Sequence, residues 1–476
     1  MRKVRSQTKI IATIGPACSS REVLFQMIEE GVDVFRLNFS HSNKAEHQKV
    51  IDLINELNKE LNINIAILAD LQGPKLRIGE VENNLIELND GDYINFVTTK
   101  CLGTKKQLYM SYDEFPMDVK IGDAVLIDDG KIKLKVIETN RTDTVKAQVI
   151  YGGPLSSRKG VNLPNTKISL PSMTDEDISN AEFAIENKVD WIALSFVRSA
   201  FDVKILKDLI QRKKGTASVI AKIEKPDALD DLEDIIEIAD AIMVARGDLG
   251  VEVPFDRVPL IQKKIVNLCI SKAKPVIIAT QMMESMITNF RPTRAEANDV
   301  ANAVIDGADA LMLSAETSVG KFPAITIRSM QKIIDWTENN GFPYNKEHAP
   351  NENTQRFLAD AICYQACKMA HQANANAIIT FTHSGYTAYK ISSHRPEADI
   401  FAFTNNKILL KKMAMVWGVR AFYCEDFNNM DDAIKYSMQL LKEKNLIAKG
   451  NVIVNIGSTP LSEKGVTNML KLGVVQ

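Results

Sequence analysis

The sequence carries almost no net charge for its length. Its 58 Lys and Arg residues nearly balance its 60 Asp and Glu residues, so the formal net charge of the 476-residue chain is −2. A chain without a charge excess has no electrostatic reason to bind nucleic acid or a membrane surface. We therefore expect its partners among small molecules, with no nucleic acid and no membrane.

Cysteines and long hydrophobic runs are scarce as well. The six cysteines are scattered and form no CxxC motif, which argues against a disulfide framework in a chain of this size. No stretch reaches the uninterrupted apolar length of a membrane span, and the basic N-terminal segment ends in the turn Gly15-Pro16 rather than in a signal-peptide core. These absences predict a cytoplasmic protein.

Familiar catalytic signatures are also missing. The sequence has no GxGxxG after an apolar run, no GxSxG elbow and no HExxH. The pair Gly320-Lys321 lacks the leading glycine and the hydroxyl residue of a phosphate-binding P-loop. Any active site must therefore be assembled by the fold from distant parts of the chain.

Short apolar runs that alternate regularly with amphipathic segments dominate most of the chain. Strands that are almost continuously apolar are buried on both faces, and alternation with helices makes them parallel. Eight strand-helix units predict an α/β fold with a closed (β/α)8 TIM barrel over residues 1–72 and 171–345. The eight runs are KIIATIG, VDVFRLNFS, INIAILADLQG, VDWIALSFV, SVIAKIE, AIMVARGDLG, PVIIATQM and ADALMLSAET.

Residues 73–170 interrupt this alternation after the third barrel strand. They contain strand-like runs joined by NDGD and DDGK, which is the turn chemistry of β-hairpins. We expect a small inserted β-barrel domain there. Because strand-to-helix loops lie on the active face of such barrels, the insert should overhang the site as a lid.

The C-terminal part, residues 346–476, follows a polar link rich in Asn and Pro. A helix is expected from about residue 354, and helical stretches then separate the runs AIITFTH, DIFAFTN, VRAFYCE and NVIVNIG. This pattern predicts a third domain, α/β with an open sheet.

Polar side chains follow six of the eight predicted barrel strands, at the end where barrel active sites lie. They are Arg36, Asn38 and Ser40 after the second strand, Asp70 after the third, Lys222 and Glu224 after the fifth, Asp248 after the sixth, Thr280 and Gln281 after the seventh, and Ser314 and Glu316 after the eighth. The cations suit an anionic substrate, and the carboxylates suit Mg²⁺, which takes one or two protein carboxylates together with substrate oxygens. Because buried unpaired charge is costly, Lys222, Glu224 and Asp248 at adjacent strand ends indicate function.

Nine segments of the chain resemble the pyruvate kinase family, over essentially the whole length and in the family's order. They are TKIIATIGPACSS, FRLNFSH, ADLQGPKLRIG, RKGVNLP, AKIEKPDAL, MVARGDLGVE, ATQMMESMI, RPTRAEANDVANAV and MLSAETSVGKFP. The resemblance implies the three-part architecture described above. It also implies phosphoryl transfer from phosphoenolpyruvate to ADP in glycolysis, followed by protonation of the enolate to pyruvate, with Mg²⁺ or Mn²⁺ as cofactor, in a homotetramer.

The resemblance further implies roles for individual residues. Glu224 and Asp248 would hold the divalent cation, Lys222 would neutralise charge on the phosphoryl group, and Thr280, with Ser314 through water, would lie on the proton path. Which group delivers the proton stays open. The expected catalytic residues are Lys222, Thr280, Arg36 and Ser314; the substrate contacts are Arg36, Lys222, Ala245, Arg246, Gly247, Asp248 and Thr280; the nucleotide contacts are Arg36, Asn38, His41, Arg77 and Lys159.

One departure from the family bears on monovalent cations. Asn38, Ser40, Asp70 and Leu71 match the family's K⁺ site, but Lys75 stands where K⁺-requiring members carry Glu. An ammonium can take the electrostatic role of a bound K⁺. We therefore expect activity that does not require K⁺.

The C-terminal domain resembles the family's effector-binding domain. The segment TFTHSGYTAYK would place Thr382, Ser384, Gly385 and Thr387 at a helix start, where hydroxyls and backbone N–H groups can hold a sugar phosphate. A second loop, GSTPLSEKGVTN, could contribute as well. The identity of an effector, or whether one binds at all, stays open.

Two other functions are compatible with parts of the pattern. A Mg²⁺-dependent lyase acting on pyruvate or oxaloacetate would also use Glu, Asp and Arg for an enolate. The inserted lid and the segment ATQMMESM argue against that reading. A catalytically silent relative is the second alternative, and the presence of Lys222, Glu224 and Asp248 argues against it.

Overall fold

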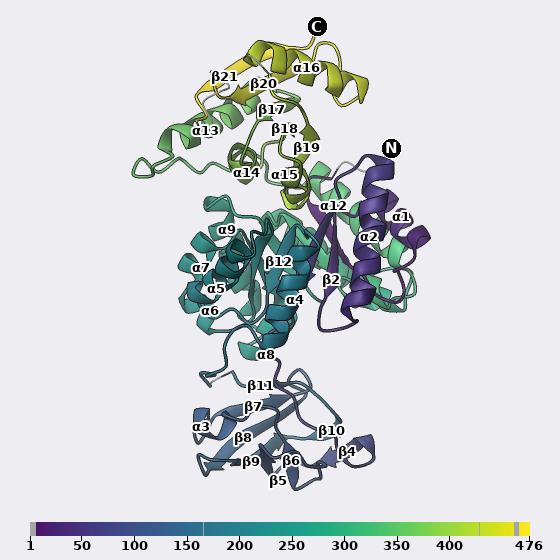
Figure 1. Ribbon diagram of the computed structural model, residues 1–476, viewed down its shortest axis with the longest axis vertical. Helices are drawn as coiled ribbons and strands as arrows, with labels where there is room; N and C mark the ends of the chain where they lie inside the picture. Colours follow the sequence, from purple (N-terminus) through teal and green to yellow (C-terminus); the bar gives the residue numbers. More distant parts are fainter. Residues whose placement is uncertain (1–5, 165, 428, 461–465) are drawn as a thin grey trace.

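The chain folds into three parts that follow one another along the longest axis of the molecule (Figure 1). The computed structural model describes residues 6–164, 166–427, 429–460 and 466–476. The barrel lies in the middle, the inserted β domain at one end and the C-terminal α/β domain at the other. The predicted fold class is confirmed.

Eight parallel strands close the barrel in the order β1-β16-β15-β14-β13-β12-β3-β2. Their bounds are β1 (Lys9–Thr13), β2 (Val34–Asn38), β3 (Ala66–Asp70), β12 (Trp191–Leu194), β13 (Ser218–Ile223), β14 (Ala241–Ala245), β15 (Val276–Ala279) and β16 (Ala310–Leu313). Nearly every residue of these strands is buried, which explains why they are continuous apolar runs in the sequence.

Helices cover the outside of the barrel (Figure 1). They are α1 (Arg21–Glu30), α2 (Lys44–Leu61), α4 (Asp175–Glu186), α5 (Ala200–Arg212), α6 (Asp227–Asp230), α7 (Leu232–Ile238), α8 (Arg246–Glu252), α9 (Val258–Ser271), α10 (Arg294–Asp306), α11 (Ala315–Ser318) and α12 (Pro323–Asn340), with a 3-10 turn η2 (Glu284–Ile287). Several begin with a capping box, as at Thr174 with Asp177 and at Thr293 with Glu296. In each box side chain and backbone satisfy each other's free N–H groups, which fixes where the helix starts.

The inserted domain, called the lid below, is all β apart from two short helices. Its elements are η1 (Glu82–Asn84), β4 (Leu85–Leu88), β5 (Tyr93–Val97), β6 (Gln107–Tyr109), α3 (Phe115–Asp118), β7 (Ala124–Ile127), β8 (Ile132–Thr139), β9 (Thr144–Tyr151), β10 (Gly153–Ser156) and β11 (Val161–Asn162). Six strands form one sheet in the order β11-β7-β8-β9-β5-β6, and β10 pairs with β4. A separate hydrophobic core fills the lid.

One of the two predicted hairpins in the lid is wrong. The DDGK turn does join the antiparallel pair β7 and β8, with Asp128 and Asp129 in the left-handed region. The NDGD turn instead joins β4 to β5, which pair with β10 and β9 and lie in different sheets. Gly91, with φ 87°, supplies the turn, but strand partners are chosen by long-range packing that the turn residues do not encode.

The C-terminal domain is a five-stranded sheet with helices packed on it. Its elements are α13 (Phe357–Gln372), β17 (Ala377–Phe381), α14 (Tyr386–Ser393), β18 (Asp399–Thr404), α15 (Lys407–Lys412), η3 (Met413–Met415), β19 (Val419–Tyr423), α16 (Met430–Glu443), β20 (Val452–Gly457) and β21 (Met469–Val474). The strand order is β19-β18-β17-β20-β21. The four expected strands are parallel, and β21, which the sequence pattern did not indicate, adds antiparallel to β20.

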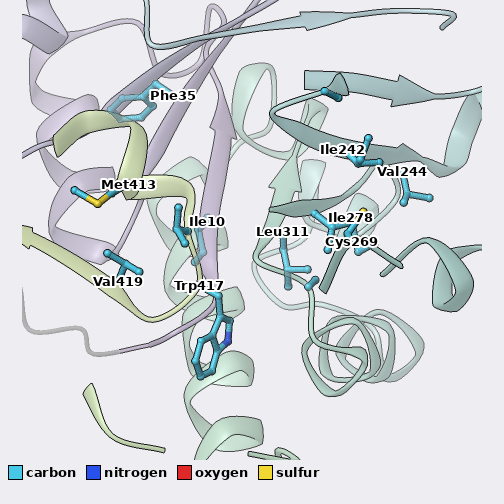
Figure 2. Packing of buried hydrophobic residues seen from close by; sticks show 14 of the residues in the cluster. Ile10, Phe35, Ile242, Val244, Cys269, Ile278, Leu311, Met413, Trp417 and Val419 are labelled. Atoms are coloured by element: carbon cyan, nitrogen blue, oxygen red, sulfur yellow. The ribbon is translucent and has the colours of Figure 1, made fainter. Parts of the chain in front are cut away.

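The C-terminal domain closes the N-terminal end of the barrel. Met415 packs against the side chains that fill the barrel interior. Figure 2 shows Met413, Trp417 and Val419 of the same segment in one buried cluster with Ile10 of β1 and Phe35 of β2. The active end of the barrel is therefore the opposite one, which faces the lid.

Four aspartates mark the N-terminal end of the barrel. One aspartate directly precedes every second strand around the barrel. These residues are Asp33 before β2, Asp190 before β12, Asp240 before β14 and Asp309 before β16. Each carboxylate accepts a hydrogen bond from a backbone N–H of the preceding strand, at Ile10, Ile67, Val219 and Val276 respectively. These bonds satisfy strand-end donors beneath the C-terminal domain.

No helix in the described ranges is long and apolar enough to cross a membrane.

Candidate active site

Asp70 holds two cations at the end of the barrel that faces the lid. Arg36 Nε lies 2.7 Å from Asp70 Oδ2, and Lys222 Nζ lies 3.2 Å from Asp70 Oδ1. Burial alone would raise the pKa of Asp70, but Lys222 and Arg36 outweigh burial and hold the pKa below its usual value. An ionised carboxylate therefore fixes both cations.

Lys222 is shared among several partners. Its Nζ lies 2.9 Å from Glu224 Oε1 and donates a hydrogen bond of 2.7 Å to Ser195 Oγ. Burial pulls the pKa of Lys222 down, but Asp70 and Glu224 outweigh burial and raise it above its ordinary value. The amine is thus a permanent, buried positive charge.

Glu224 and Asp248 form a carboxylate pair whose negative charge is only partly balanced. Burial raises the pKa of Glu224 and the nearby Asp248 adds to the rise, against the lowering effect of Lys222. The backbone N–H of Phe196 donates to Glu224 Oε2 at 2.6 Å. Within the described part of the chain, Asp248 has no salt bridge within 4 Å. The pair therefore fits a hard divalent cation.

Thr280 lies beside the start of α8 in a strained conformation. Its φ is 69°, in the left-handed region that a β-branched residue rarely adopts. Its Oγ1 accepts a hydrogen bond of 2.7 Å from the N–H of Gly247 and donates one of 2.6 Å to the carbonyl of Ala279. The surrounding structure thus holds this hydroxyl against the N-terminal turn of α8, which also contains Asp248.

The expected substrate contacts at residues 245–247 lie at that same turn. Ala245 ends β14, and Arg246 and Gly247 open α8. The Arg246 side chain points away into the barrel wall, where it pairs with Asp299 at 2.7 Å and donates to the carbonyl of Thr280 at 2.8 Å. Any contact from Arg246 to a substrate must therefore come from its backbone.

Ser314 follows β16 and is half-buried. Its N–H donates to Glu316 Oε2 at 2.6 Å, and Glu316 Oε1 accepts from the N–H of Met283. The buried Glu316 therefore positions the backbone of Ser314 and leaves the hydroxyl side chain for other contacts.

A cleft open to solvent lies between the lid and the barrel. Lid and hinge residues on its wall are Pro74, Lys75, Leu76, Asp129, Gly160, Val161, Asn162 and Ile168, and barrel residues are Phe196, Arg198, Lys225 and Asp248. Lys75 lines this cleft together with Asp248, and its Cε would lie 3.6 Å from a methyl group placed at Gly160. The structure gives Lys75 no contact with Asp70.

Of the expected nucleotide contacts, Arg36 belongs to the Lys222 cluster and Asn38 contacts Ser40. The other three come from the lid and from the barrel. Lys159 pairs with Asp128 inside the lid at 2.8 Å, and Arg77 donates to the carbonyl of Arg158 at 3.1 Å. His41 is exposed at the start of α2, on the barrel. The structure does not join these three side chains to the Lys222 cluster.

Three of the four residues of the expected K⁺ site already offer an oxygen to a donor within the protein. Asn38 Oδ1 accepts from the N–H of Ser40 at 3.1 Å, and the carbonyl of Leu71 accepts from Ser195 Oγ at 2.6 Å. Asp70 holds Arg36 and Lys222 as described above.

The expected effector loop caps α14. Gly385 has φ 88° and its N–H donates to Thr382 Oγ1 at 2.9 Å, while Ser384 is exposed. Thr387 Oγ1 lies 3.1 Å from Thr467 Oγ1 of the second loop. Residues 461–465 of that loop lie outside the described residues.

Sequence reasoning missed several residues of the site. Thr13, which accepts from Arg36 Nη1 at 2.9 Å, ends β1, and Ser195 follows β12. Reading the ends of the first and fourth strands by the rule used for the other six would have found both. Asp177, which accepts from the N–H of Gly73, and Arg198, which donates to the carbonyls of Ile168 and Leu170, pin both ends of the lid to the barrel without a distinctive sequence signal.

Fold and site together define a (β/α)8-barrel enzyme with a lid over a cluster suited to an anionic substrate. A family model described as "Pyruvate kinase, barrel domain" matches residues 5–327, and one described as "Pyruvate kinase, alpha/beta domain" matches residues 360–472. A pyruvate kinase of Corynebacterium glutamicum is 40% identical over 464 residues, which are 98% of this chain and 96% of that protein. A pyruvate kinase of Mycobacterium tuberculosis is 38% identical over 462 residues, which are 97% of this chain and 97% of that protein.

A solved structure gives the same result. The crystal structure of a pyruvate kinase from Cryptosporidium parvum matches with a TM-score of 0.91 at 34% identity, over 99% of this chain and 97% of that one. The chain belongs to the pyruvate kinase family and is a transferase.

Proposed function

We propose that the chain transfers the phosphoryl group of phosphoenolpyruvate to ADP, giving pyruvate and ATP, as a step of glycolysis. The observation that carries this proposal is the buried cluster of Lys222 and Arg36 on Asp70, beside the carboxylates of Glu224 and Asp248. Phosphoryl transfer needs positioning and charge stabilisation more than covalent chemistry from the protein. The cluster offers both.

Glu224 and Asp248 would hold Mg²⁺ or Mn²⁺. Burial and the nearby Asp248 raise the pKa of Glu224, which means that they disfavour its ionised form. A bound divalent cation would stabilise that ionised form. Among the described residues no group of three or more His, Cys, Asp or Glu could hold a metal by itself. Substrate oxygens would therefore complete the shell, as Mg²⁺ prefers, and the bound ion would supply charge neutralisation at phosphate and carboxylate.

Lys222 and Arg36 would bind the phosphoryl group. Arg36 uses Nε on Asp70 and Nη1 on Thr13, which leaves Nη2 for a phosphate oxygen. The amine of Lys222 would balance the charge on the phosphoryl oxygens during transfer. Backbone N–H groups of Ala245, Arg246 and Asp248 at the start of α8 would receive the substrate carboxylate, where the helix dipole favours an anion. The N–H of Gly247 would join them by exchanging its bond to Thr280 Oγ1 for one to the substrate.

Thr280 would lie on the proton path to the enolate carbon, with Ser314 acting through water. The strained backbone of Thr280 holds its hydroxyl beside Gly247, at the place where the substrate would sit. Arg77 and Lys159 from the lid, with Asn38 and His41 from the barrel, would contact the nucleotide once the lid lies over the cleft.

Two features of the site support activity without K⁺. The amine of Lys222 and the guanidinium of Arg36 already balance the charge of Asp70, so part of the charge that a bare cation would supply there comes from the chain itself. Lys75 adds a fixed positive charge to the cleft beside Asp248. The Lys75 amine would thus replace the charge of K⁺ in the cleft rather than its position on Asp70.

We further propose three functional domains in a cytoplasmic homotetramer. These are a catalytic barrel of residues 1–72 and 171–345, a lid of residues 73–170, and a regulatory domain of residues 346–476. Thr382, Ser384, Gly385 and Thr387 would hold a sugar-phosphate effector at the start of α14, where backbone N–H groups face an anion. Sedimentation tests the tetramer, since a monomer would contradict it.

The first experiment is a coupled assay of pyruvate formation from phosphoenolpyruvate and ADP with Mg²⁺. It is run with K⁺ and, in parallel, with only a bulky organic cation. Equal turnover in both is expected; no turnover in either would overturn the proposed function. Lys75→Glu should then create a K⁺ requirement, whereas Lys105→Glu, the same change at an exposed lid position, should not.

A further inference from the structure

The lid and the barrel share one buried carboxylate. Glu252, the last residue of α8, is 5% exposed. Its Oε1 accepts a hydrogen bond of 2.6 Å from Lys225 Nζ of the barrel and one of 2.8 Å from Asn162 Nδ2 of the lid. Among the hydrogen bonds of the described residues, the bond from Asn162 is the one that joins a lid strand, β11, to the barrel.

This carboxylate is built into the same elements as the proposed metal site. Lys225 directly follows Glu224, and Glu252 lies one helical turn after Asp248 on α8, so the two acids share a helix face. A second contact supports the arrangement, because a methyl group at Gly130 in the β7–β8 turn of the lid would lie 3.7 Å from Val251 Cγ1 on α8. The lid therefore rests on the helix that presents Asp248.

We propose that Glu252 is a positioning residue that latches the lid over the cleft, with Asn162 as the lid's half of the latch. The buried pair of Glu252 with Lys225 lies within the barrel and persists when the lid lifts, whereas the bond to Asn162 breaks. A hydrogen bond to a charged acceptor is stronger than one between neutral groups, so one side chain is enough to bias a two-state lid.

The consequence for the reaction rests on the proposed function. Lys159 and Arg77 of the lid are the proposed nucleotide contacts, so the latch should act on nucleotide binding first. Loss of the latch should raise KM for ADP more than KM for phosphoenolpyruvate. A purely structural role of Asn162 in folding the lid would not produce this split.

The latch can be broken and rebuilt with small changes. Asn162→Asp sets a carboxylate against Glu252, so the open-to-closed ratio should rise at least about tenfold. Adding Glu252→Gln removes the opposing carboxylate. Because Lys225 and residue 162 both contact Glu252 Oε1 in the wild type, the new aspartate then lies close enough to pair with Lys225, so the ratio should return toward that of the wild type. Asn162→Ala breaks the bond without adding charge and serves if the aspartate variant folds poorly.

Asn140→Asp is the matched control. Asn140 lies on the lid surface and donates to Asp143 at 2.7 Å within the lid, so the same chemical change there leaves the barrel contact intact. Lid position is measured by electron–electron distance spectroscopy between spin labels on Cys101 in the lid and on Lys49→Cys in α2. Cys101 is half-exposed and the other five cysteines are buried, which directs labelling.

The expected result is a longer or broader distance distribution for Asn162→Asp and Asn162→Ala, restored in the double variant and unchanged in Asn140→Asp. Distances that stay the same in the two Asn162 variants, or a double variant that stays open, would overturn the latch. Because distances are read without turnover, absence of pyruvate formation in the wild type would overturn the proposed function and leave the latch standing.

Discussion

The amine of Lys222 lies 3.2 Å from Asp70 Oδ1, and this contact joins the third and fifth strands of the barrel at its active end. Both groups are buried, and each is held in its charged form by the other. A buried ion pair of this kind adds little to stability, because desolvation offsets most of the attraction. Its presence at a substrate cleft is therefore better explained by the fixed charge that it offers to a ligand.

Lys222→Met should separate chemistry from metal binding. Without the amine, turnover should fall by about 10³-fold or more, the scale seen when a charge-stabilising group is removed. Glu224 loses its competing cation at 2.9 Å, so Mn²⁺ should bind as tightly as before or more tightly. Assays of pyruvate formation and Mn²⁺ titration by electron paramagnetic resonance measure both quantities.

Lys207→Met is the matched control for that change. Lys207 forms a half-buried pair with Asp240 at 2.8 Å, away from the cleft. Its variant should keep both turnover and Mn²⁺ affinity. A Lys222→Met enzyme that turned over normally, or lost Mn²⁺ binding, would contradict the assigned role.

Thr280→Ala should slow proton transfer more than phosphoryl transfer. The change removes the hydroxyl that Gly247 contacts at 2.7 Å but leaves the charged cluster in place. A positioned acid or relay typically contributes at least about 10²-fold, and exchange of the methyl protons of pyruvate with solvent should slow by that factor. Thr280→Ser keeps the hydroxyl and should recover most of the exchange; equal exchange in all three proteins would exclude Thr280 from the proton path.

Much of the architecture could be predicted from the sequence because it depends on local patterns. Continuous apolar runs such as that of β14 indicate burial on both faces, and this pattern predicted all eight barrel strands. Strand β21 was not predicted, because it is a partly exposed edge strand and its sequence lacks a continuous apolar run. The failed NDGD hairpin has the same origin, since the partner of β4 is the distant β10.

The site divides in the same way. Lys222, Glu224 and Asp248 were predicted because each lies near the C-terminal end of a strand, and the barrel brings such positions together. Glu252 lies at the end of helix α8 and Arg198 lies in a loop. Both contact residues of the inserted segment, so these contacts depend on where the lid lies. No pattern in the sequence encodes that placement. The engagement of Gly247 by Thr280 likewise depends on a left-handed backbone that a threonine rarely adopts.

Arg395→Met should weaken the junction between the barrel and the C-terminal domain. Arg395 and Asp309 form an almost fully buried pair at 2.8 Å, and the backbone N–H of Trp417 also donates to Asp309. Removing the arginine leaves a buried carboxylate without its cation, which typically costs about 3–5 kcal/mol. Urea unfolding measures the loss. Arg328→Met, which breaks a surface pair with Glu30, should cost far less, because solvent screens such a pair.

Asp190→Asn should change how stability depends on pH. Burial raises the pKa of Asp190 to about 6, although Lys411 and Lys412 of the C-terminal domain oppose the rise. A carboxyl with a higher pKa in the folded state binds its proton more tightly there than in the unfolded chain. Its contribution to stability is therefore complete below about pH 4 and is lost as the pH rises through 6.

For a shift of this size the wild type should lose on the order of 2–3 kcal/mol of unfolding free energy between pH 4 and pH 7 from this group. Asp190→Asn keeps an oxygen for the Ile67 N–H at 2.9 Å but cannot ionise, so its stability relative to the wild type should rise over that range. Urea unfolding at several pH values measures the difference. Asp52→Asn on the surface of α2 lacks the burial that causes the effect and should follow the wild type. An Asp190→Asn curve parallel to that of the wild type would mean that the carboxylate ionises in the folded protein as readily as in the unfolded chain.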